Sequence, residues 1–355
     1  MKKTFDAIGI MSGTSLDGVD LAYCVFELQG EKWQYSIEAA GTYPYDEDFK
    51  RKLVSAMNTD AEHFCRLHVE SGIYFGNIVN EFIAGHRIKP GLIGSHGHTV
   101  FHQPEHSMSI QIGSGAHISA ITGIETVCDF RMTDAALGGQ GAPLVPIGDR
   151  FLFSEYDYCL NLGGIANISF DDSGGNRIAF DICPVNMALN MLAMEQNQEF
   201  DENGKMASRG DINMDLLAQL NALAYYSLTP PKTLGKEWFD KNLSTLITDR
   251  SVPVEARMRT MTEHIAFQIS KCMSRAKSKK VLVTGGGAFN KFLVEKIREQ
   301  SGQEIIVPDA RLVKFKEALI FAFLGVLRKA GMINTLSSVT GAIRNSSGGA
   351  IFAGN

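Results

Sequence analysis

Two stretches of this sequence repeat the same order of strand, glycine-bearing turn and strand, one near the start and one near the middle. In each, apolar runs stand on either side of a turn that contains two glycines, a pattern typical of strands joined by tight turns. The predicted strands cover residues 8–11 and 19–26 in the first stretch and residues 158–162, 165–170 and 178–180 in the second. The recurrence predicts a duplicated α/β architecture with a cleft between its halves.

Helical spacing follows each of these stretches, because apolar residues recur there mostly every three or four positions. The predicted helices cover residues 49–57 and 62–84 after the first stretch and residues 186–196 and 214–224 after the second. Further along, residues 253–277 have a methionine-rich stripe that is typical of a core helix. Residues 281–284 then predict a buried strand, which runs into three glycines and a helix that starts near Asn290.

Composition narrows the class of protein. At 355 residues the chain is long enough for about two domains, and its 45% hydrophobic content and mean hydropathy of −0.03 fit sizeable cores. The net charge of −5 argues against a general nucleic-acid binder, because such proteins carry a basic excess. The most apolar run, residues 318–327, is too short to span a bilayer and predicts a buried helix.

The cysteines and the first residues indicate a cellular compartment. Six cysteines are scattered without any CxxC pair, and several lie in apolar runs, where a free thiol behaves as a small hydrophobic group. This usage is typical of a reducing cytoplasm. No basic segment followed by an apolar one opens the sequence, so no secretory signal is expected.

Glycines mark three strand ends, at Gly13 to Gly18, at Gly163-Gly164 and at Gly285 to Gly287. The common nucleotide signatures GxxxxGK[ST] and GxGxxG are absent. Glycine nevertheless lets a backbone approach a phosphate closely, and consecutive N–H groups form an anion-binding nest. An ordinary tight turn explains any one of these sites, whereas three at strand ends favour a nucleotide cleft.

Two aspartates, Asp17 and Asp20, lie in or next to the first glycine turn. Phosphoryl-transfer sites hold Mg²⁺ with carboxylates, often through water. Aspartate also caps turns by bonding to its own backbone, so a purely structural role stays open.

Four of the nine histidines lie within eleven residues, at His96, His98, His102 and His106. Clustered histidines raise the alternative of a zinc site. The HExxH pattern of a helical zinc site is absent, and the first two follow an apolar strand in a glycine-rich turn. Polar substrate contacts or turn positions are therefore favoured over metal ligation.

Charged residues also follow two other predicted strands. Arg131 stands between Asp129 and Asp134, where it forms either a structural ion pair or a bidentate grip on a substrate carboxylate. Asp181 comes just after a strand and before a Cys-Pro turn. A partly desolvated carboxylate at a strand end is a reasonable general base.

Seven segments of the chain, in order from residue 8 to about residue 342, carry a family resemblance. They are GIMSGTSLDGVD, SHGHTVFHQP, QIGSGAHISAITGIETVCDFRMTDAALGGQGAPLVP, LNLGGIANIS, PPKTLGKEWF, VTGGGAFN and VTGA. The sequence resembles the anhydro-N-acetylmuramic acid kinases, of the hexokinase–actin–heat-shock-chaperone superfamily. The resemblance implies a duplicated actin/hexokinase-like (ribonuclease H-like) α/β fold of two lobes, with ATP in the interlobe cleft. The expected lobes are residues 1–129 with about 336–355, and residues 130–335.

The resemblance also implies a reaction that joins phosphorylation to hydrolysis. ATP donates its γ-phosphoryl group to O6 of 1,6-anhydro-N-acetylmuramic acid, while water opens the anhydro bridge at C1. The products are N-acetylmuramic acid 6-phosphate and ADP, in the recycling of murein. Mg²⁺, a cytoplasmic location and a homodimer are expected, without nucleic-acid or membrane partners. The alternatives are an ordinary hydroxyl-sugar kinase of the same fold, a non-catalytic ATP-gated scaffold and a histidine-based zinc hydrolase.

Site roles follow from the resemblance, residue by residue. Asp181 would be the base that takes a proton from the attacking water. The residues expected to bind ATP are Gly13, Thr14, Ser15, Leu16, Asp17, Gly18, Val19, Asp20, Gly163, Gly164, Gly285, Gly286 and Gly287. Asp17 and Asp20 would orient Mg²⁺, and contacts through water are the expected mode. The residues expected at the sugar are Thr99, Arg131, Asp134 and Glu317, with Arg131 a candidate for the lactyl carboxylate.

The sequence departs from the family pattern at two places. After Asp181 it has ICPVN, where the family usually has TGPGN, so Cys183 and Val185 replace two glycines. His98 stands where glutamine is more usual. We expect the added bulk beside Asp181 to alter the local turn or the fit of the sugar.

Overall fold

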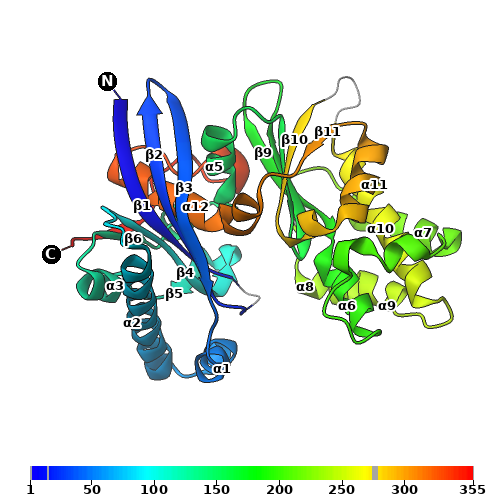
Figure 1. Ribbon diagram of the computed structural model, residues 1–355, viewed down its shortest axis with the longest axis horizontal. Helices are drawn as coiled ribbons and strands as arrows, with labels where there is room; N and C mark the ends of the chain where they lie inside the picture. The colour runs from blue at the N-terminus through cyan, green and yellow to red at the C-terminus, as the bar shows by residue number, and fades with distance from the viewer. Residues whose placement is uncertain (1, 14–15, 274–278, 355) are drawn as a thin grey trace. The chain divides into compact units, whose positions relative to one another are not determined.

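The computed structural model describes residues 2–13, 16–273 and 279–354, and its internal contacts divide the chain into two compact units (Figure 1). The first unit comprises Met1–Leu152 and Phe315–Asn355, and the second comprises Phe153–Lys314. The sequence placed the lobe boundaries near residues 129 and 335 instead. In the structure, residues 130–152 and 315–335 belong to the first unit. The second range belongs to it because the long helix that covers much of this range lies against the first sheet.

The first unit is built on a sheet of seven strands in the order β12-β6-β4-β1-β2-β3, with β5 paired to β4. The strands are β1 (Lys2–Ser12), β2 (Val19–Gln29), β3 (Lys32–Tyr43), β4 (Ile93–Gln103), β5 (Met108–Ile112), β6 (Thr126–Cys128) and β12 (Ala350–Phe352). β1, β2 and β3 form an antiparallel meander, whereas β4 runs parallel to β1 and β6 runs parallel to β4.

Helices cover both faces of this sheet. Those of the first unit are α1 (Glu47–Ser55), α2 (Ala61–His86), α3 (Gly115–Thr122), α4 (Met132–Ala136), α5 (Val145–Leu152), α13 (Ser337–Thr340) and, from Phe315 onward, α12 (Ala310–Lys329). Ile8 and Ile10 of β1 pack in one cluster with Phe75 of α2. Gly9, which points to the opposite face, meets α12: a Cβ atom there would lie 1.7 Å from the carbonyl oxygen of Ala318. α12 thus rests almost directly on the sheet backbone.

The second unit repeats this topology with five strands in the order β11-β10-β7-β8-β9. The strands are β7 (Tyr158–Leu162), β8 (Ile165–Asp171), β9 (Arg177–Pro184), β10 (Lys280–Thr284) and β11 (Glu304–Ile306). Again the first three strands are antiparallel, and the next two run parallel to the first. Both sheets therefore share one strand order and one set of directions, which confirms the predicted duplicated α/β fold.

The helices of the second unit surround its larger apolar core. They are α6 (Asn186–Met194), α7 (Met214–Asn221), α8 (Lys236–Trp238), α9 (Ser244–Ile247), α10 (Val254–Lys271) and α11 (Lys291–Ser301). The methionine-rich stripe predicted for residues 253–277 is buried along α10, where Met258, Met261 and Ile265 have no exposed surface. Asn290 caps α11 by accepting a hydrogen bond from the backbone N–H of Leu293.

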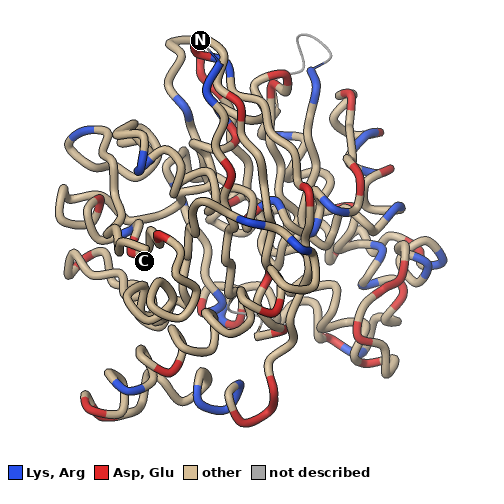
Figure 2. The backbone as a smooth tube through the Cα atoms, turned by 60° about the vertical axis from the view of Figure 1, so that its left-hand side comes forward, with Lys and Arg blue, Asp and Glu red and all other residues tan. Residues whose placement is uncertain are grey.

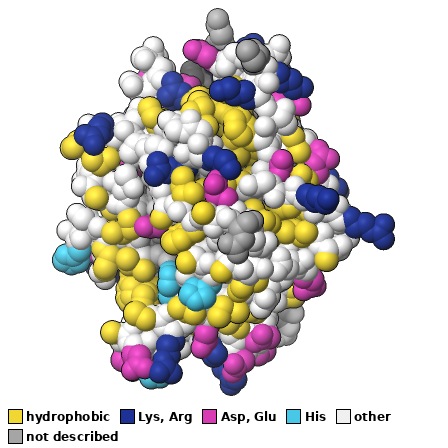
Figure 3. All heavy atoms as spheres, turned by 90° about the vertical axis from the view of Figure 1, so that its left-hand side faces the viewer, with side chains coloured by type: hydrophobic (Ala, Val, Ile, Leu, Met, Phe, Trp, Pro, Cys, Tyr) yellow, Lys and Arg dark blue, Asp and Glu magenta, His cyan; other side chains and the backbone are white. Residues whose placement is uncertain are grey.

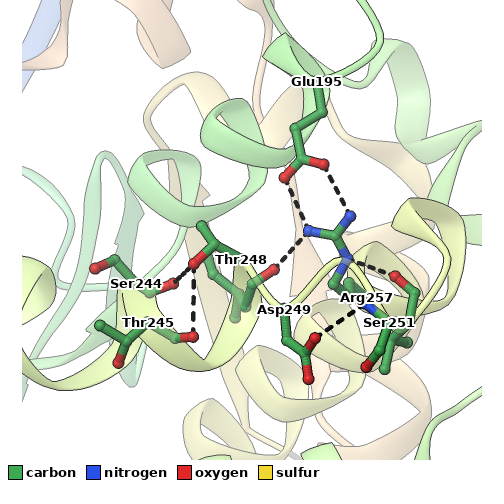
Figure 4. Close-up of polar contacts among 9 residues, drawn as sticks. Glu195, Ser244, Thr245, Thr248, Asp249, Ser251 and Arg257 are labelled. Carbon is green, nitrogen blue, oxygen red and sulfur yellow. Dashed lines mark hydrogen bonds and ion pairs between the residues drawn. The ribbon is translucent and has the colours of Figure 1, made fainter.

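A buried arginine ties α10 to the end of α6 (Figure 4). The Arg257 guanidinium donates to both carboxylate oxygens of Glu195, each at 2.8 Å, and to the carbonyl oxygens of Ile247 and Val252. The Arg257 side chain is only 3% exposed. Such a bidentate pair is strongly directional, so it fixes how the chain around α9 meets α10.

The surface carries a mixture of side chains. Figure 2 shows basic and acidic positions interspersed along the chain, and Figure 3 shows hydrophobic, charged and histidine side chains on one face. Exposed large apolar residues of the first unit include Val54, Met57 and Ile73. Scattered residues of this kind are normal on protein surfaces, so the homodimer stays a prediction. None of the helices among the described residues has both the length and the apolar character that a membrane crossing requires.

Candidate active site

Asp181 lies on β9 and is held by four hydrogen bonds. Its Oδ2 atom accepts from Thr233 Oγ1 at 2.8 Å and from the backbone N–H of Leu234 at 2.9 Å. Its backbone N–H donates to the carbonyl oxygen of Lys232 at 3.2 Å, and its own carbonyl oxygen accepts from the Tyr225 hydroxyl at 2.7 Å. Burial raises the pKa of Asp181 above its usual range, while the two bonds to Oδ2 oppose that rise.

The glycine turns of the second unit lie at one edge of its sheet. Gly163-Gly164 follows β7 and Gly285 to Gly287 follows β10, and these parallel neighbours end at the same edge. A Cβ atom on Gly285 would lie 2.6 Å from Asn161 Oδ1, so the two strand ends touch. The backbone N–H of Asn186, at the start of α6, donates to the first of these glycines at 3.2 Å. Bare backbone beside a helix N-terminus fits the phosphates of a nucleotide.

In the first unit, the glycine loop joins β1 to β2. Gly18 has φ +154°, and a Cβ atom there would lie 2.4 Å from the carbonyl oxygen of Tyr43, so only glycine fits. Leu16 has φ 60°, and its N–H donates to Gly13 O at 3.4 Å. Val19 is fully buried and begins β2. Thr14 and Ser15, which the sequence also assigns to ATP, lie outside the described residues.

Two carboxylates of this loop fit a water-bridged Mg²⁺ ion. Asp17 is exposed, whereas Asp20 is partly buried and accepts a hydrogen bond from the Thr42 hydroxyl. Mg²⁺ bound with ATP commonly uses one or two carboxylates together with phosphate oxygens and water. Within the described ranges, no group of three or more His, Cys, Asp or Glu residues is arranged to hold a metal.

A buried polar triad holds the end of β1, just before the glycine loop. Ser12 Oγ is hydrogen-bonded to the Tyr45 hydroxyl at 2.5 Å and to His98 Nδ1 at 2.9 Å. Burial lowers the pKa of His98 to about 4, so the imidazole is neutral at pH 7. The parallel pairing of Ser12 with His98 explains their meeting, but nothing in the sequence pointed to Tyr45.

His96 and Arg131 form a second buried arrangement. His96 Nδ1 donates to Gly97 O at 2.9 Å, which leaves Nε2 to accept from Arg131 at 2.8 Å. Burial and the nearby Arg131 charge hold the pKa of His96 well below its usual range. Arg131 also donates to Gly141 O at 2.8 Å, and burial lowers its pKa to about 10, against the opposing charge of Glu317. The guanidinium is thereby held in one orientation, as recognition of a planar anion requires.

Asp134 has a structural place in the first unit. It is fully buried, its Oδ2 accepts from the Gly141 N–H at 2.8 Å, and its Oδ1 accepts from the Thr340 hydroxyl at 2.7 Å. A direct substrate contact would require this buried carboxylate to become accessible. The contact expected from the sequence stays a prediction, and Asp134 instead braces the loop whose Gly141 carbonyl holds Arg131.

Two other predicted sugar residues are more open. Thr99 on β4 is partly buried and accepts from Gln111 Nε2 at 3.4 Å. Glu317 on α12 has an exposed side chain, yet the surrounding protein raises the pKa of its carboxyl by desolvation, against the charges of Lys316 and Arg131. The adjacent Lys316 is buried and forms an ion pair with Asp149 at 2.7 Å. Glu317 and Arg131 are thus electrostatic neighbours within one unit.

The remaining histidines of the cluster have separate contacts. His102 Nδ1 is hydrogen-bonded to Ser109 Oγ at 3.1 Å, and His106 is exposed in a short 3-10 helix. His96 and His98 face Arg131 and Ser12, as described above. Each of the first three histidines therefore has its own hydrogen-bond partner.

The two residues that replace the family's glycines beside Asp181 point away from the surface. Cys183 and Val185 have no exposed surface and belong to the apolar core of the second unit. Their side chains fill the core at the end of β9. The expected effect of this bulk on the sugar stays a prediction.

A family model described as anhydro-N-acetylmuramic acid kinase matches residues 6–354. Proteins with this name are similar over almost their whole length. One from Vibrio cholerae is 36% identical over 97% of this chain and 97% of its own, and one from Vibrio vulnificus is 34% identical over 98% of each. One from Caldanaerobacter subterraneus is 32% identical over 94% of this chain and 93% of its own.

Solved structures resemble the chain more distantly. Component A of (R)-2-hydroxyglutaryl-CoA dehydratase from Acidaminococcus fermentans has a TM-score of 0.46 and 13% identity, over 92% of this chain and 99% of its own. Xylulose kinase from Rhodospirillum rubrum has a TM-score of 0.41 and 11% identity, over 90% of each chain. Likenesses this distant carry no conclusion about function. The family match and the identity over nearly the full length of the relatives do, and the chain belongs to the anhydro-N-acetylmuramic acid kinase family.

Proposed function

We propose that the protein transfers the γ-phosphoryl group of ATP to O6 of 1,6-anhydro-N-acetylmuramic acid while water opens the 1,6-anhydro bridge. Family membership supports the substrate and the reaction. The observation that carries the mechanism is Asp181, a half-buried carboxylate with a raised pKa and one oxygen fixed by Thr233 and Leu234. Such a group is suited to take a proton from water.

The proposed step balances in atoms and charge. Asp181 takes one proton from water, and the water oxygen forms a bond to C1 as the C1–O6 bond breaks. The electron pair of that bond stays on O6, which attacks the γ-phosphorus and releases ADP. Phosphoryl transfer needs positioning and charge neutralisation more than covalent help from the protein.

The nucleotide is assigned to the glycine segments of the two units. In the first unit we assign the loop from Gly13 to Asp20, whose start is fixed by Ser12. In the second we assign Gly163-Gly164 and Gly285 to Gly287, the last of these near adenosine. Mg²⁺, when bound, neutralises phosphate charge, and the exposed carboxylate of Asp17 together with Asp20 would orient its water ligands.

The sugar is assigned to residues of the first unit. Arg131, held by His96 and Gly141, would bind the lactyl carboxylate. Its guanidinium makes three of its five possible N–H donations within the described part of the chain, so the other two would be used for that carboxylate. Glu317 and Thr99 would contact hydroxyl or amide groups of the sugar. Asp134 would act through the Gly141 loop.

The alternatives differ in what they consume. An ordinary sugar kinase would phosphorylate a hydroxyl and leave the anhydro ring intact, and an ATP-gated scaffold would turn ATP over without sugar. The cytoplasmic location fits the scattered cysteines, none of which forms a disulfide in the described part of the chain. A homodimer belongs to the proposal only through the family.

The decisive experiment is a phosphate-transfer assay with ATP, Mg²⁺ and 1,6-anhydro-N-acetylmuramic acid in ¹⁸O-water. We expect a 6-phosphate that carries ¹⁸O at C1 at early times, with an exchange control because free sugars exchange their anomeric oxygen. Asp181→Asn should abolish the product. A phosphorylated sugar with its ring intact would make the protein a plain sugar kinase, and no product would reject the proposed substrate.

A further inference from the structure

One segment of the family resemblance was assigned no role from the sequence. This segment, PPKTLGKEWF, covers residues 230–239 and lies mostly between two short helical stretches. The structure places its residues 232–234 against Asp181. We call these three residues the 232–234 clamp.

The 232–234 clamp extends the edge of the second sheet. β9 is the last strand of that sheet, so its outer backbone edge has no strand partner in the sheet order. There the Asp181 N–H donates to Lys232 O at 3.2 Å, much as in strand pairing. Leu234 is only 8% exposed and belongs to the apolar core, so the clamp is anchored beyond its hydrogen bonds.

The clamp then reaches the side chain of Asp181. Thr233 Oγ1 and the Leu234 N–H both donate to Oδ2, at 2.8 and 2.9 Å. In the described part of the chain, no donor is recorded for Oδ1. Because the terminal torsion of aspartate is broad, a carboxylate without such bonds rotates readily between its two oxygens. Two donors on one oxygen remove that freedom.

We propose that Thr233 is a positioning residue for the reaction: together with the Leu234 N–H it fixes Oδ2 of Asp181, so that Oδ1 is the oxygen that takes the proton from water. This inference rests on the proposed function. Thr233 itself is exposed and does not need to touch the substrate. Its hydroxyl acts through Asp181.

Other charged and titratable groups surround this pair. Tyr225 donates its hydroxyl to the Asp181 carbonyl, and Lys232 Nζ lies 4.7 Å from the centre of the Tyr225 ring. Cys183 lies two residues along β9, and Lys271 and Cys272 at the end of α10 interact electrostatically with Lys232. The two hydrogen bonds to Oδ2 stabilise the ionised carboxylate and thereby oppose the rise in pKa that burial causes.

Removal of the Thr233 hydroxyl therefore has two measurable consequences. The pKa of Asp181 rises, because the ionised form loses a donor. The acid limb of the pH profile of kcat, below which the base is protonated, then moves to higher pH. Loss of orientation also lowers the plateau of kcat, whereas the KM for ATP does not change.

The test compares Thr233→Val, Thr233→Ser and Thr248→Val in the full chain. Thr248 is a matched control, because it is an exposed threonine of the same unit whose hydroxyl donates to Ser244 O at 2.9 Å (Figure 4). For Thr233→Val we expect the acid limb to move up by about one pH unit and the plateau kcat to fall about tenfold, as loss of a hydrogen bond to a charged group implies. Thr233→Ser should restore both values, and Thr248→Val should match the wild type.

A second readout does not depend on turnover. Carboxyl ¹³C NMR titration, with the Asp181 signal identified by its loss in Asp181→Asn, should show a higher pKa in Thr233→Val than in the wild type and no change in Thr248→Val. An active wild type together with an unchanged acid limb, plateau and NMR pKa in Thr233→Val would overturn the inference alone. Equal losses in Thr233→Val and Thr248→Val would also overturn it, as a structural effect. A wild type without the ring-opening activity would instead reject the proposed function, whatever the NMR titration shows.

Discussion

Single side chains in the first unit show how burial decides protonation. Ser12, Tyr45 and His98 form a triad before the glycine loop, and the neutral imidazole of His98 is part of it. The parallel pairing of β1 with β4 explains the contact between Ser12 and His98. Tyr45 follows β3 and meets them only through the three-dimensional fold, so no local sequence pattern could indicate it.

The lowered pKa of His98 predicts a pH dependence of stability. The folded-state pKa is about 4 and the ordinary value is about 6.5. Between these values the unfolded state binds more protons, so stability is fully present above about pH 6.5 and is lost as the pH falls toward 4. We expect His98→Gln to reduce this loss by about 2 kcal/mol between pH 7 and pH 4.5. Urea unfolding at pH 7 and pH 4.5 measures it, and the exposed His106→Gln should behave as the wild type.

Arg131 carries a second prediction at this scale. Lysine keeps the charge but lacks the planar fork that binds a carboxylate in two places. We expect Arg131→Lys to raise the KM for the anhydro sugar by about tenfold, with the KM for ATP unchanged, because one bidentate contact is worth roughly 1.4 kcal/mol or more. Steady-state kinetics in both substrates checks this. An equal rise in both KM values would contradict the assignment of Arg131 to the sugar.

Whole elements are fixed by close contacts that no local pattern predicts. The sequence predicted most helices within a few residues, because their apolar spacing is regular. It did not predict that α12 would start at Ala310 and lie on the bare backbone of β1 and β4. Nor did it predict that the segment around residue 233 would bond to Asp181, since the partners are 52 residues apart.

The contact between β1 and α12 leads to a prediction. Gly9→Ala places a methyl group against the Ala318 carbonyl, and because the nearest atoms belong to the backbone, the strand or the helix must shift. We expect the free energy of unfolding to fall by about 3 kcal/mol. Gly85→Ala is the matched control, because no atom lies within 4 Å of its added Cβ, and it should be neutral or slightly stabilising. Chemical denaturation of both variants tests whether α12 packs as tightly against β1 as described.

We expect the loss of the Arg257–Glu195 pair to lower the stability of the fold without lowering the catalytic activity. Arg257→Met leaves a partly buried carboxylate without its partner, and breaking such a pair costs about 3 kcal/mol or more. The exposed Arg51, paired with Asp48, offers the control Arg51→Met, for which we expect less than about 1 kcal/mol. Thermal and urea unfolding measure both changes. An unstable Arg257→Met enzyme that also lost its kcat at low temperature would argue for a wider role.

At the scale of the whole molecule, the duplicated fold was the feature that the sequence predicted best. Both halves repeat strand, glycine turn and strand because both sheets use the same order and directions. The lobe boundaries were harder to predict, because the chain returns to the first unit at residues 315–335, after the whole of the second unit. Of the candidate site, the sequence pointed to the glycine turns and Asp181, whose roles stay predictions. It did not point to the residues that hold them, because those contacts join distant parts of the chain.

The function at this scale predicts little ATP turnover without sugar. In the proposed reaction the acceptor oxygen comes from the sugar itself, so ATP alone has no substrate oxygen to attack its phosphorus. We expect ADP release without sugar to be below about one hundredth of the rate with it, a difference of roughly 2.7 kcal/mol in barrier. A coupled ADP assay measures both rates. Rapid turnover without sugar would favour the ATP-gated scaffold.

The seat of α12 on the sheet has a consequence for how this site can change during evolution. Gly9 lies three residues before Ser12, Gly94 lies just before His96 and His98, and Glu317 lies on the helix that both glycines touch. Two backbone contacts on one helix therefore set the relative positions of three separate parts of the first unit. Side chains on either surface can be exchanged one at a time to suit a new ligand. The spacing between them is inherited as a unit, and a lineage that altered it would have to rebuild all three parts together.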